Sequence, residues 1–280
     1  MFISQRMLKI VLKVLSGGLL ILALSGYAAE KHVSLVTSVW EPYVMPKNIS
    51  SRGYAYDVVK KAFESAGYEV SIQVLPWNEA WKMAKEGKAD ALFPEYESDE
   101  NLGYFAYSHP FLAGPVVLYK RVDNKYIQIA ETEKNLSSVF DKLKPYRFGV
   151  VSGYANVPAF DVHKEEFKRK YVGDDKANLE QLYAGEVDVI LIDKLNAQYI
   201  LRYMLPKEYS QQLQQVGPVL ANNNIYVVFS KAVPNRDILL KDFNQGLKML
   251  QKDKVTNQIM REYIYEFIDK DAAPHQIDTH

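Results

Sequence analysis

The sequence predicts an α/β fold with two lobes of like construction, each a mostly parallel sheet flanked by helices. Short apolar strands alternate with amphipathic helices, as happens where crossover helices join parallel strands. The tetrapeptide Gly-Lys-Ala-Asp at 87–90 has a counterpart, Gly-Glu-Val-Asp, at 185–188. The chain has 280 residues, of which 48% are hydrophobic and 24% charged, which suits a globular protein with a sizeable core.

Residues 1–28 are expected to be a cleaved secretory signal. Three basic residues and no acid occur in the first 13 positions, an apolar run follows, and Gly26 and Ala28 provide small side chains before the cut. The run of about eleven residues is short against the ~20 needed to span a bilayer, which argues against an uncleaved membrane anchor. Because the chain has no cysteine for a lipid anchor, the mature protein is expected to be free in a bacterial periplasm.

The first lobe begins with a strand at 33–37 and a helix at 57–66, which a glycine follows. A strand at 70–75 alternates apolar and polar residues. Pro76 then opens a helix, again ended by a glycine, and 89–93 is a buried strand.

The second lobe repeats this order. Residues 147–151 form a strand, a helix follows Tyr154, and a helix at 178–184 leads into the buried strand 187–191. Another helix is expected at 194–202.

Two segments are interpreted as crossings between the lobes: the polar stretch 121–133, and 221–224, which precedes a strand at 225–229. Helical periodicity over 238–267 predicts a terminal helix that packs back on the first lobe. The resulting division is 29–120 plus 222–268 for lobe 1, 121–221 for lobe 2, and a loose polar tail at 269–280.

Several classes of protein are excluded by composition and motifs. Lys plus Arg and Asp plus Glu both number 34, so the basic excess of a duplex-binding protein is missing. No catalytic signature or phosphate loop occurs, and the five histidines lack metal-ligand spacing. We therefore expect no enzyme, cofactor, metal or nucleic acid, and a monomer.

Aromatic and acidic residues follow the predicted strands. Ligands of open parallel sheets bind beyond the carboxyl ends of the strands, so these residues are expected to face one cleft between the lobes. They are Trp40, Tyr43, Trp77, Glu95 and Tyr96 in lobe 1, and Ser152, Tyr154 and Asp193 in lobe 2. The alternatives are that Trp40 and Tyr43 pack on the rim, that Glu95 is a solvated loop residue, and that Asp193 only caps the following helix. Trp81 is expected to fill the core.

In order and spacing, six segments resemble the family 3 extracytoplasmic solute-binding proteins, the periplasmic receptors typical of polar amino-acid ABC importers. They are Trp40-Glu-Pro-Tyr43, Gly53-Tyr-Ala-Tyr-Asp57, Gly87-Lys-Ala-Asp90, Tyr107-Ser-His-Pro-Phe111, Arg147-Phe-Gly-Val-Val-Ser-Gly153, and Gly185-Glu-Val-Asp188 through Asp193. The resemblance covers residues 33–267. It implies a type II-like periplasmic binding fold, with two lobes joined by a two-strand hinge that close over a small ligand.

The ligand contacts of the family carry over only in part. In its amino-acid binders an arginine grips the ligand carboxylate, and the position that matches it here is Asn101. The family's Gly-Thr-Thr turn is Gly-Tyr-Ala at 153–155, whereas the aspartate for the ammonium group is kept as Asp193. A cationic or polyhydroxylated ligand therefore fits better than a standard amino acid, unless another base such as Arg52 grips the carboxylate.

Three functions follow from the resemblance. The first is ligand capture for ABC import, with a membrane permease as partner. The second is ligand sensing, in which the closed receptor docks on a membrane signalling protein. The third is a dehydratase-like enzyme on the same fold, which the missing arginine argues against.

Overall fold

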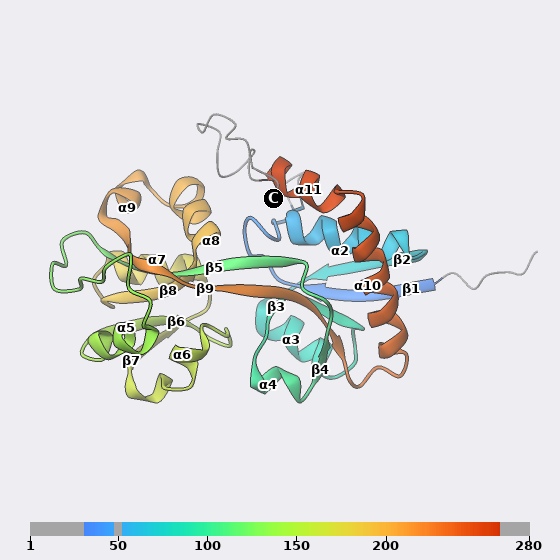
Figure 1. Ribbon diagram of the computed structural model, residues 1–280, viewed down its shortest axis with the longest axis horizontal. Helices are drawn as coiled ribbons and strands as arrows, with labels where there is room; N and C mark the ends of the chain where they lie inside the picture. The colour runs from blue at the N-terminus through green and yellow to red at the C-terminus, as the bar shows by residue number, and fades with distance from the viewer. Residues whose placement is uncertain (1–30, 48–51, 264–280) are drawn as a thin grey trace, which may run out of the picture. The chain divides into compact units, whose positions relative to one another are not determined.

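The computed structural model describes residues 31–47 and 52–263 (Figure 1). The predicted leader at 1–28 and the predicted tail at 269–280 lie outside the described residues, as do the last residues of the predicted terminal helix.

Lobe 1 contains the alternating elements that the sequence predicts. They are β1 (Lys31–Thr37), α2 (Tyr54–Ser65), β2 (Tyr68–Val74), α3 (Trp77–Lys85) and β3 (Ala91–Tyr96), followed by the short α4 (Asp99–Leu102) and β4 (Phe105–Tyr107). Helix α2 begins three residues before its predicted start, after Gly53 at φ 100°. A Cβ on Gly53 would lie 2.4 Å from the Tyr43 carbonyl oxygen, so only glycine fits this entry to the helix.

Lobe 2 follows the same alternation. Its elements are α5 (Leu136–Leu143), β6 (Arg147–Val151), α6 (Pro158–Asp161), β7 (Lys168–Val172), α7 (Asp175–Tyr183), β8 (Val189–Asp193), α8 (Lys194–Tyr199) with a π-helical turn at Ile200–Met204, and α9 (Lys207–Gln212). Helix α7 also begins before its predicted start, because the Asp174 side chain accepts a hydrogen bond from the Ala177 backbone N–H at 2.8 Å.

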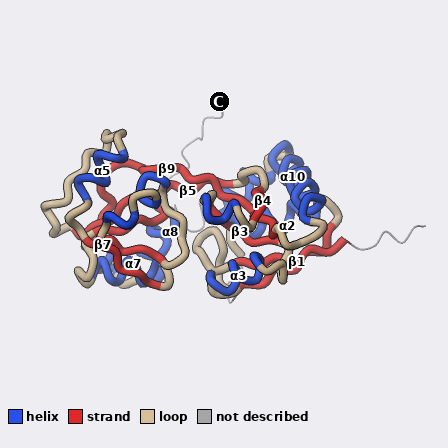
Figure 2. Tube along the Cα trace, turned by 90° about the horizontal axis from the view of Figure 1, so that it is seen from below, coloured by secondary structure: helices blue, strands red, loops and turns tan. Residues whose placement is uncertain are grey.

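Two long strands connect these sets of elements. Strands β5 (Leu112–Arg121) and β9 (Leu213–Ser230) pair antiparallel, and Figures 1 and 2 both show them side by side. The strand order is β2-β1-β3-β9-β5-β8-β6-β7, with β4 on β9. Strand β1 is parallel to β3, and β6 is parallel to β7 and β8, so each lobe has the parallel strands that the sequence predicts.

The segment 221–224 lies inside β9, which is longer than the predicted strand 225–229. Ala221 pairs with Val116 and Asn224 with Ala113, so its partner is β5 and not the stretch 121–133. Asparagine has a low intrinsic propensity for strands, but pairing with β5 provides hydrogen-bond partners for the backbone groups of Asn222, Asn223 and Asn224. The register shifts between Val116 and Leu118, opposite a bulge in β9 that contains Gly217 at φ 74°.

Buried side chains form two clusters in each lobe. In lobe 1 one of them includes Phe63, Phe93 and Phe229, and α10 (Arg236–Lys252) and α11 (Val255–Tyr263) contribute to it. The predicted single terminal helix is thus two helices, separated at Lys254, whose φ is 58°. Lobe 2 has a phenylalanine-rich cluster and an aliphatic cluster on the two faces of its strands.

The repeated tetrapeptides perform the same local task in both lobes. Gly87 and Gly185 both have positive φ after a helix, at 69° and 73°. Asp90 then accepts a hydrogen bond from the Ser34 N–H at 2.8 Å, and Asp188 accepts one from the Arg147 N–H at 2.8 Å. Each aspartate ties its turn to the parallel strand beside it, β1 or β6.

Candidate ligand-binding site

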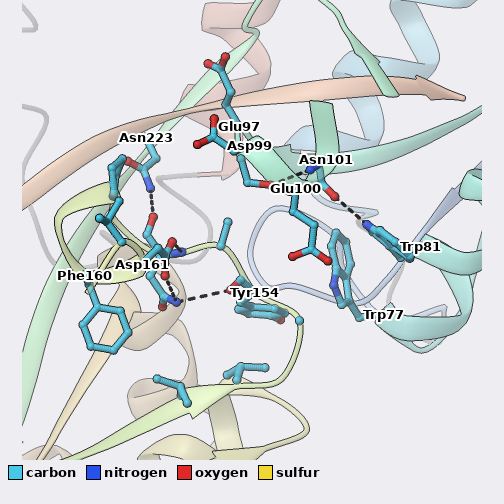
Figure 3. A pocket seen from close by; sticks show the side chains of 18 of the residues that line it. Trp77, Trp81, Glu97, Asp99, Glu100, Asn101, Tyr154, Phe160, Asp161 and Asn223 are labelled. Atoms are coloured by element: carbon cyan, nitrogen blue, oxygen red, sulfur yellow. Dashed lines mark hydrogen bonds between the residues drawn. The ribbon is translucent and has the colours of Figure 1, made fainter. Parts of the chain in front are cut away.

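A cavity of about 910 Å³ lies between the two lobes, within the size range of small-molecule sites. Lobe 1 contributes Trp77, Trp81 and residues 97–101, lobe 2 contributes Tyr154 and Asp161 among others, and Asn222, Asn223 and Asn224 come from β9. Figure 3 shows Trp77 of lobe 1 next to Tyr154 of lobe 2, with Glu100 beside Trp77. The ring centroids of Trp77 and Tyr154 lie 6.0 Å apart in an edge-to-face arrangement.

A smaller recess of about 40 Å³ adjoins the cavity. It is lined by Ser38, Trp40, Trp77, Pro94, Glu95, Tyr96, Tyr154 and Ala155. Trp77, Tyr154 and Ala155 also line the large cavity, so the two spaces share a wall. The Trp40 and Tyr96 rings meet edge to face at 5.7 Å. The recess is therefore mostly aromatic, with one carboxyl group.

That carboxyl group, Glu95, is buried with 6% of its surface exposed. Its Oε1 accepts a hydrogen bond from the Tyr96 N–H at 2.9 Å, whereas its Oε2 has no hydrogen-bond partner among the described residues. Burial raises the pKa of Glu95 to about 8, although the Tyr96 N–H and the nearby Asn101 amide favour its charged form. The interpretation of Glu95 as a solvated loop residue is thus wrong, since it lies at the buried end of β3.

Asp193 is buried as well, but its oxygens are fully used. It caps α8 by accepting from the Leu195 and Asn196 N–H groups at 2.9 and 3.0 Å. It also accepts from the Tyr43 hydroxyl at 3.0 Å and the Tyr96 hydroxyl at 3.4 Å, both from lobe 1. Burial raises its pKa to about 6, although these donors favour the charged form.

Two further contacts join the lobes next to Asp193. The Asn196 side chain donates to the Glu41 carbonyl oxygen at 2.5 Å. The Trp40 indole N–H has no partner at hydrogen-bond distance, yet it is close enough to Asp175 to favour that carboxylate. Burial, with Asp193 and Asp174 nearby, raises the pKa of Asp175 to about 8. The pKa of Glu41 is also raised by burial, so this region is rich in acids that are costly to ionise.

The structure places six of the nine predicted site residues on a cavity wall. Trp40, Trp77, Glu95, Tyr96 and Tyr154 line the recess, and Asn101 lines the large cavity with Trp77 and Tyr154.

Tyr43, Ser152 and Asp193 line neither space. Tyr43 is buried against Asp193, and the Ser152 backbone N–H donates to Val172. The expected capping by Asp193 is found.

Trp81 differs from its predicted place in the core. It packs only partly buried against Phe105 and Tyr104, and it also lines the large cavity. Its indole N–H donates to the Asn101 side-chain oxygen at 3.0 Å, which fixes the Asn101 amide at the wall (Figure 3).

Several wall residues were not predicted as site residues. Asn156 and Asp161 come from the loop and helix after β6, where only the strand end was considered. The run 222–224 is visible in the sequence, but it was interpreted as a crossing. If 222–224 had been recognised as part of a paired strand, the alternation of side chains between its two faces would have placed some of these asparagines on the cavity wall.

The basic residues near the site are engaged elsewhere. The Arg52 guanidinium lies 4.8 Å from the centre of the Tyr56 ring and lines neither space. Arg169 lines the large cavity and pairs with Glu165 at 2.6 Å. Among the described residues that line the recess there is no lysine, arginine or histidine.

This fold and cavity define a two-lobed ligand-binding protein. The chain belongs to the bacterial extracellular solute-binding proteins, family 3, whose sequence profile matches residues 34–266. The family resemblance predicted from the motifs is thus confirmed. No curated protein matches the chain in sequence. Within residues 31–47 and 52–263, no helix has the length and apolar character to cross a membrane. No group of His, Asp or Glu side chains in these ranges is arranged to hold a metal ion.

Solved structures share the fold at low sequence identity. A histidine kinase sensor domain similar to periplasmic binding proteins matches with a TM-score of 0.69 and 17% identity over 83% of this chain and 96% of its own. An arginine transport-system periplasmic binding protein from Legionella pneumophila matches with a TM-score of 0.67 and 19% identity, over 84% of this chain and 100% of its own. The GluR0 ligand-binding core from Nostoc punctiforme, in complex with L-glutamate, matches with a TM-score of 0.64 and 17% identity, over 85% of this chain and 99% of its own.

Proposed function

We propose that this protein is an exported receptor that captures a small polar ligand between its lobes and takes part in no bond chemistry. The observation that carries the proposal is the cavity of about 910 Å³, whose wall comes from lobe 1, lobe 2 and β9 together. A ligand that contacts both lobes favours the arrangement in which they approach each other. It shifts that equilibrium only by its difference in affinity for the two arrangements.

The proposed roles follow from the contacts. Trp77 and Tyr154 present aromatic surface from opposite lobes, and Asn101 and the β9 asparagines provide amides for polar groups. The β5–β9 pair is the proposed hinge, and the lobe boundaries are proposed to lie where it passes from one set of strands to the other. The Tyr43–Asp193 hydrogen bond would form as the lobes approach.

A thermal-shift screen of the exported protein tests the proposal. The panel holds amino acids, polyamines, sugars, short peptides and prephenate. A ligand at ~100 times its Kd adds about 2.7 kcal/mol of stability, and about 2–4 °C of Tm shift is expected per kcal/mol. Each compound that raises the Tm is then examined by small-angle scattering, where the radius of gyration should fall on binding. A binder that leaves the radius unchanged contradicts capture by closure.

Import and sensing use the same closure, so they remain two candidate uses of the ligand. The likeness to an arginine transport-system binding protein supports import through a membrane permease, and the likeness to a histidine kinase sensor domain supports signalling. Both likenesses are at the level of fold. An adjacent permease and ATPase gene favours import, whereas an adjacent sensor gene or a solitary gene favours signalling.

A dehydratase-like activity is the third candidate. Elimination from a carboxylate substrate needs cationic groups to hold the carboxylates. None of the described residues that line the recess is cationic, and Arg169 in the large cavity is paired with Glu165. Prephenate in the screen decides this point, because its consumption would identify an enzyme.

The proposed location is the periplasm, reached through removal of residues 1–28. The family is extracellular, and the leader has a basic start, an apolar run and small residues before the cut. N-terminal sequencing of the protein from a periplasmic extract should begin at Ala29 or one residue later. A chain that still begins at Met1 in the membrane fraction contradicts cleavage.

A further inference from the structure

Glu95 carries a buried oxygen, Oε2, without a partner at hydrogen-bond distance among the described residues, and the Asn101 amide lies near enough to favour the charged form of the carboxyl. Only 6% of the residue is exposed. An unpaired buried carboxyl oxygen is costly, and such groups in native proteins are usually paired. Since Glu95 lines the recess, a ligand group that enters there can provide the missing partner.

The rest of the recess suits a positive charge. Four aromatic residues surround the space, Trp40, Trp77, Tyr96 and Tyr154, and aromatic ring faces attract cations. The volume of about 40 Å³ accommodates a group of ammonium size, on a scale where one water needs roughly 10–15 Å³.

The larger cavity disfavours a carboxylate and favours a second positive charge. Glu97, Asp99, Glu100 and Asp161 line it, whereas Arg169 is the one basic residue among the described wall residues and pairs with Glu165. Asn101, on the same wall, is neutral and accepts a hydrogen bond from the Trp81 indole N–H. An anionic group next to the bound ammonium would therefore lie among acids (Figure 3).

We propose that Glu95 and the four rings form an ammonium-binding recess, and that the ligand is an organic cation, such as a linear diamine, with no carboxylate beside the bound ammonium group. This inference rests on the proposed receptor function and names its ligand class. One ammonium occupies the recess beside the Glu95 carboxyl group, and the rest of the ligand extends into the acidic cavity.

Binding is coupled to proton release. Burial raises the pKa of Glu95 to about 8, so this carboxyl is protonated at pH 7 until a cation stabilises its charge. The titratable groups that interact with it are the phenols of Tyr107 and Tyr154, whose own pKa values are raised and which stay neutral in this range. Affinity therefore rises from pH 6 to pH 8 and levels off above.

The first test compares ligands that differ only by a carboxylate. Cadaverine is lysine without its carboxylate, and agmatine is arginine without its carboxylate. Titration calorimetry on the exported protein at pH 8 should show each amine binding at least tenfold more tightly than its amino acid. At pH 7, titrations in buffers of different ionisation enthalpy should show proton release that approaches one per cadaverine bound. Equal or tighter binding of the amino acids overturns the proposal, whatever the variants below do.

The second test compares two glutamates on the same wall. Glu95→Gln removes the charge in the recess, and Glu97→Gln removes an exposed charge two residues away that lines only the large cavity. Glu95→Gln should weaken cadaverine binding at least tenfold at pH 8 and abolish its pH dependence, whereas Glu97→Gln should change it less than threefold. Equal losses would assign the effect to the general field of the cavity and overturn the role of Glu95.

The outcomes separate this inference from the receptor function. If glutamine or glucose binds and the amines do not, the ammonium recess is overturned and the receptor stands. If no compound binds, cadaverine included, the ammonium recess is overturned and the receptor function also loses its support.

Discussion

Glu95 and Asp193 are buried carboxyl groups at the carboxyl ends of corresponding strands, β3 in lobe 1 and β8 in lobe 2. Asp193 accepts from two backbone N–H groups and two tyrosine hydroxyls. Glu95 accepts from one N–H, and its other oxygen has no hydrogen-bond partner within residues 31–47 and 52–263. Burial raises both pKa values, to about 6 for Asp193 and about 8 for Glu95, and the smaller value belongs to the group with more donors. The same position in the repeat thus stabilises the fold in one lobe and is open to a ligand in the other.

The largest expected effect comes from raising the pH until three buried carboxyl groups, these two and Asp175, become ionised. Glu95, Asp175 and Asp193 hold their protons more tightly in the folded protein than unfolded carboxyls, which titrate near pH 4. The unfolded chain therefore ionises first as pH rises, and stability falls between about pH 4 and 8. The Tm without ligand should therefore drop from pH 5.5 to pH 8.5. A Tm that is constant or rises over this range contradicts the burial of these carboxyls.

Removing Asp193 should cost more stability than removing the charge of Glu95. Asp193→Ala loses the α8 cap and leaves the buried Tyr43 hydroxyl without its acceptor, so the free energy of unfolding should fall by about 2–3 kcal/mol. Glu95→Gln keeps the shape and removes the cost of holding a proton on a carboxyl whose folded-state pKa is about 8, so it should raise the free energy of unfolding at pH 7. Urea denaturation at pH 7 measures both. Losses of equal size would make the two carboxyls equivalent and remove the distinction drawn between them.

Of the two tryptophans of α3, we expect Trp77 to contribute mainly to ligand binding and Trp81 to contribute to stability. Trp77 lines both spaces, so Trp77→Ala should weaken ligand binding about tenfold. Trp81 holds Asn101 and packs on Phe105, so Trp81→Ala should lower stability by about 1–3 kcal/mol as well. Calorimetry and urea denaturation on both variants separate the two effects. If Trp77→Ala lowers only stability, Trp77 belongs to the core.

The smallest effect concerns the two repeated turns. The Asp90 carboxylate accepts a hydrogen bond from the Ser34 backbone N–H. The Asp188 carboxylate accepts hydrogen bonds from both the backbone N–H and the guanidinium group of Arg147. At pH 7, Asp188→Asn should thus lower the free energy of unfolding by about 0.5–1 kcal/mol more than Asp90→Asn does. The Arg147 contact lowers the pKa of Asp188, so its contribution is present above pH 4 and is lost as pH falls further. Urea denaturation at pH 7 and pH 3 should show the difference between the variants shrinking at the lower pH.

Local patterns were sufficient to predict most of the fold. Glycines with positive φ follow the helices before both repeated turns, and β6 matches its predicted range of 147–151. Strand β9 was predicted at less than a third of its length, because its extent depends on backbone partners in β5 that lie about a hundred residues away in sequence. Asparagine propensity alone indicates a loop there.

The site was predictable where it depends on strand ends and not where it depends on contacts between lobes. Glu95 and Tyr154 follow strands predicted from the sequence, and both lie on the wall of the recess. The Tyr43–Asp193 hydrogen bond joins residues 150 positions apart, and it is this contact that turns two expected ligand residues into a lobe-to-lobe link. Whether an expected polar side chain meets a ligand or another side chain is decided by tertiary packing, which no local pattern encodes.

The bulge in β9 separates the strand into two independently registered halves. Val216 pairs with Leu118 and Ala221 with Val116, so the residues between them have no one-to-one partners in β5. A length change in an ordinary strand moves every later side chain to the opposite face. Here an insertion or deletion can be absorbed between 216 and 221 while both pairings persist. A change of chain length at this point would therefore leave the wall residues on both sides of the bulge on the faces they now occupy.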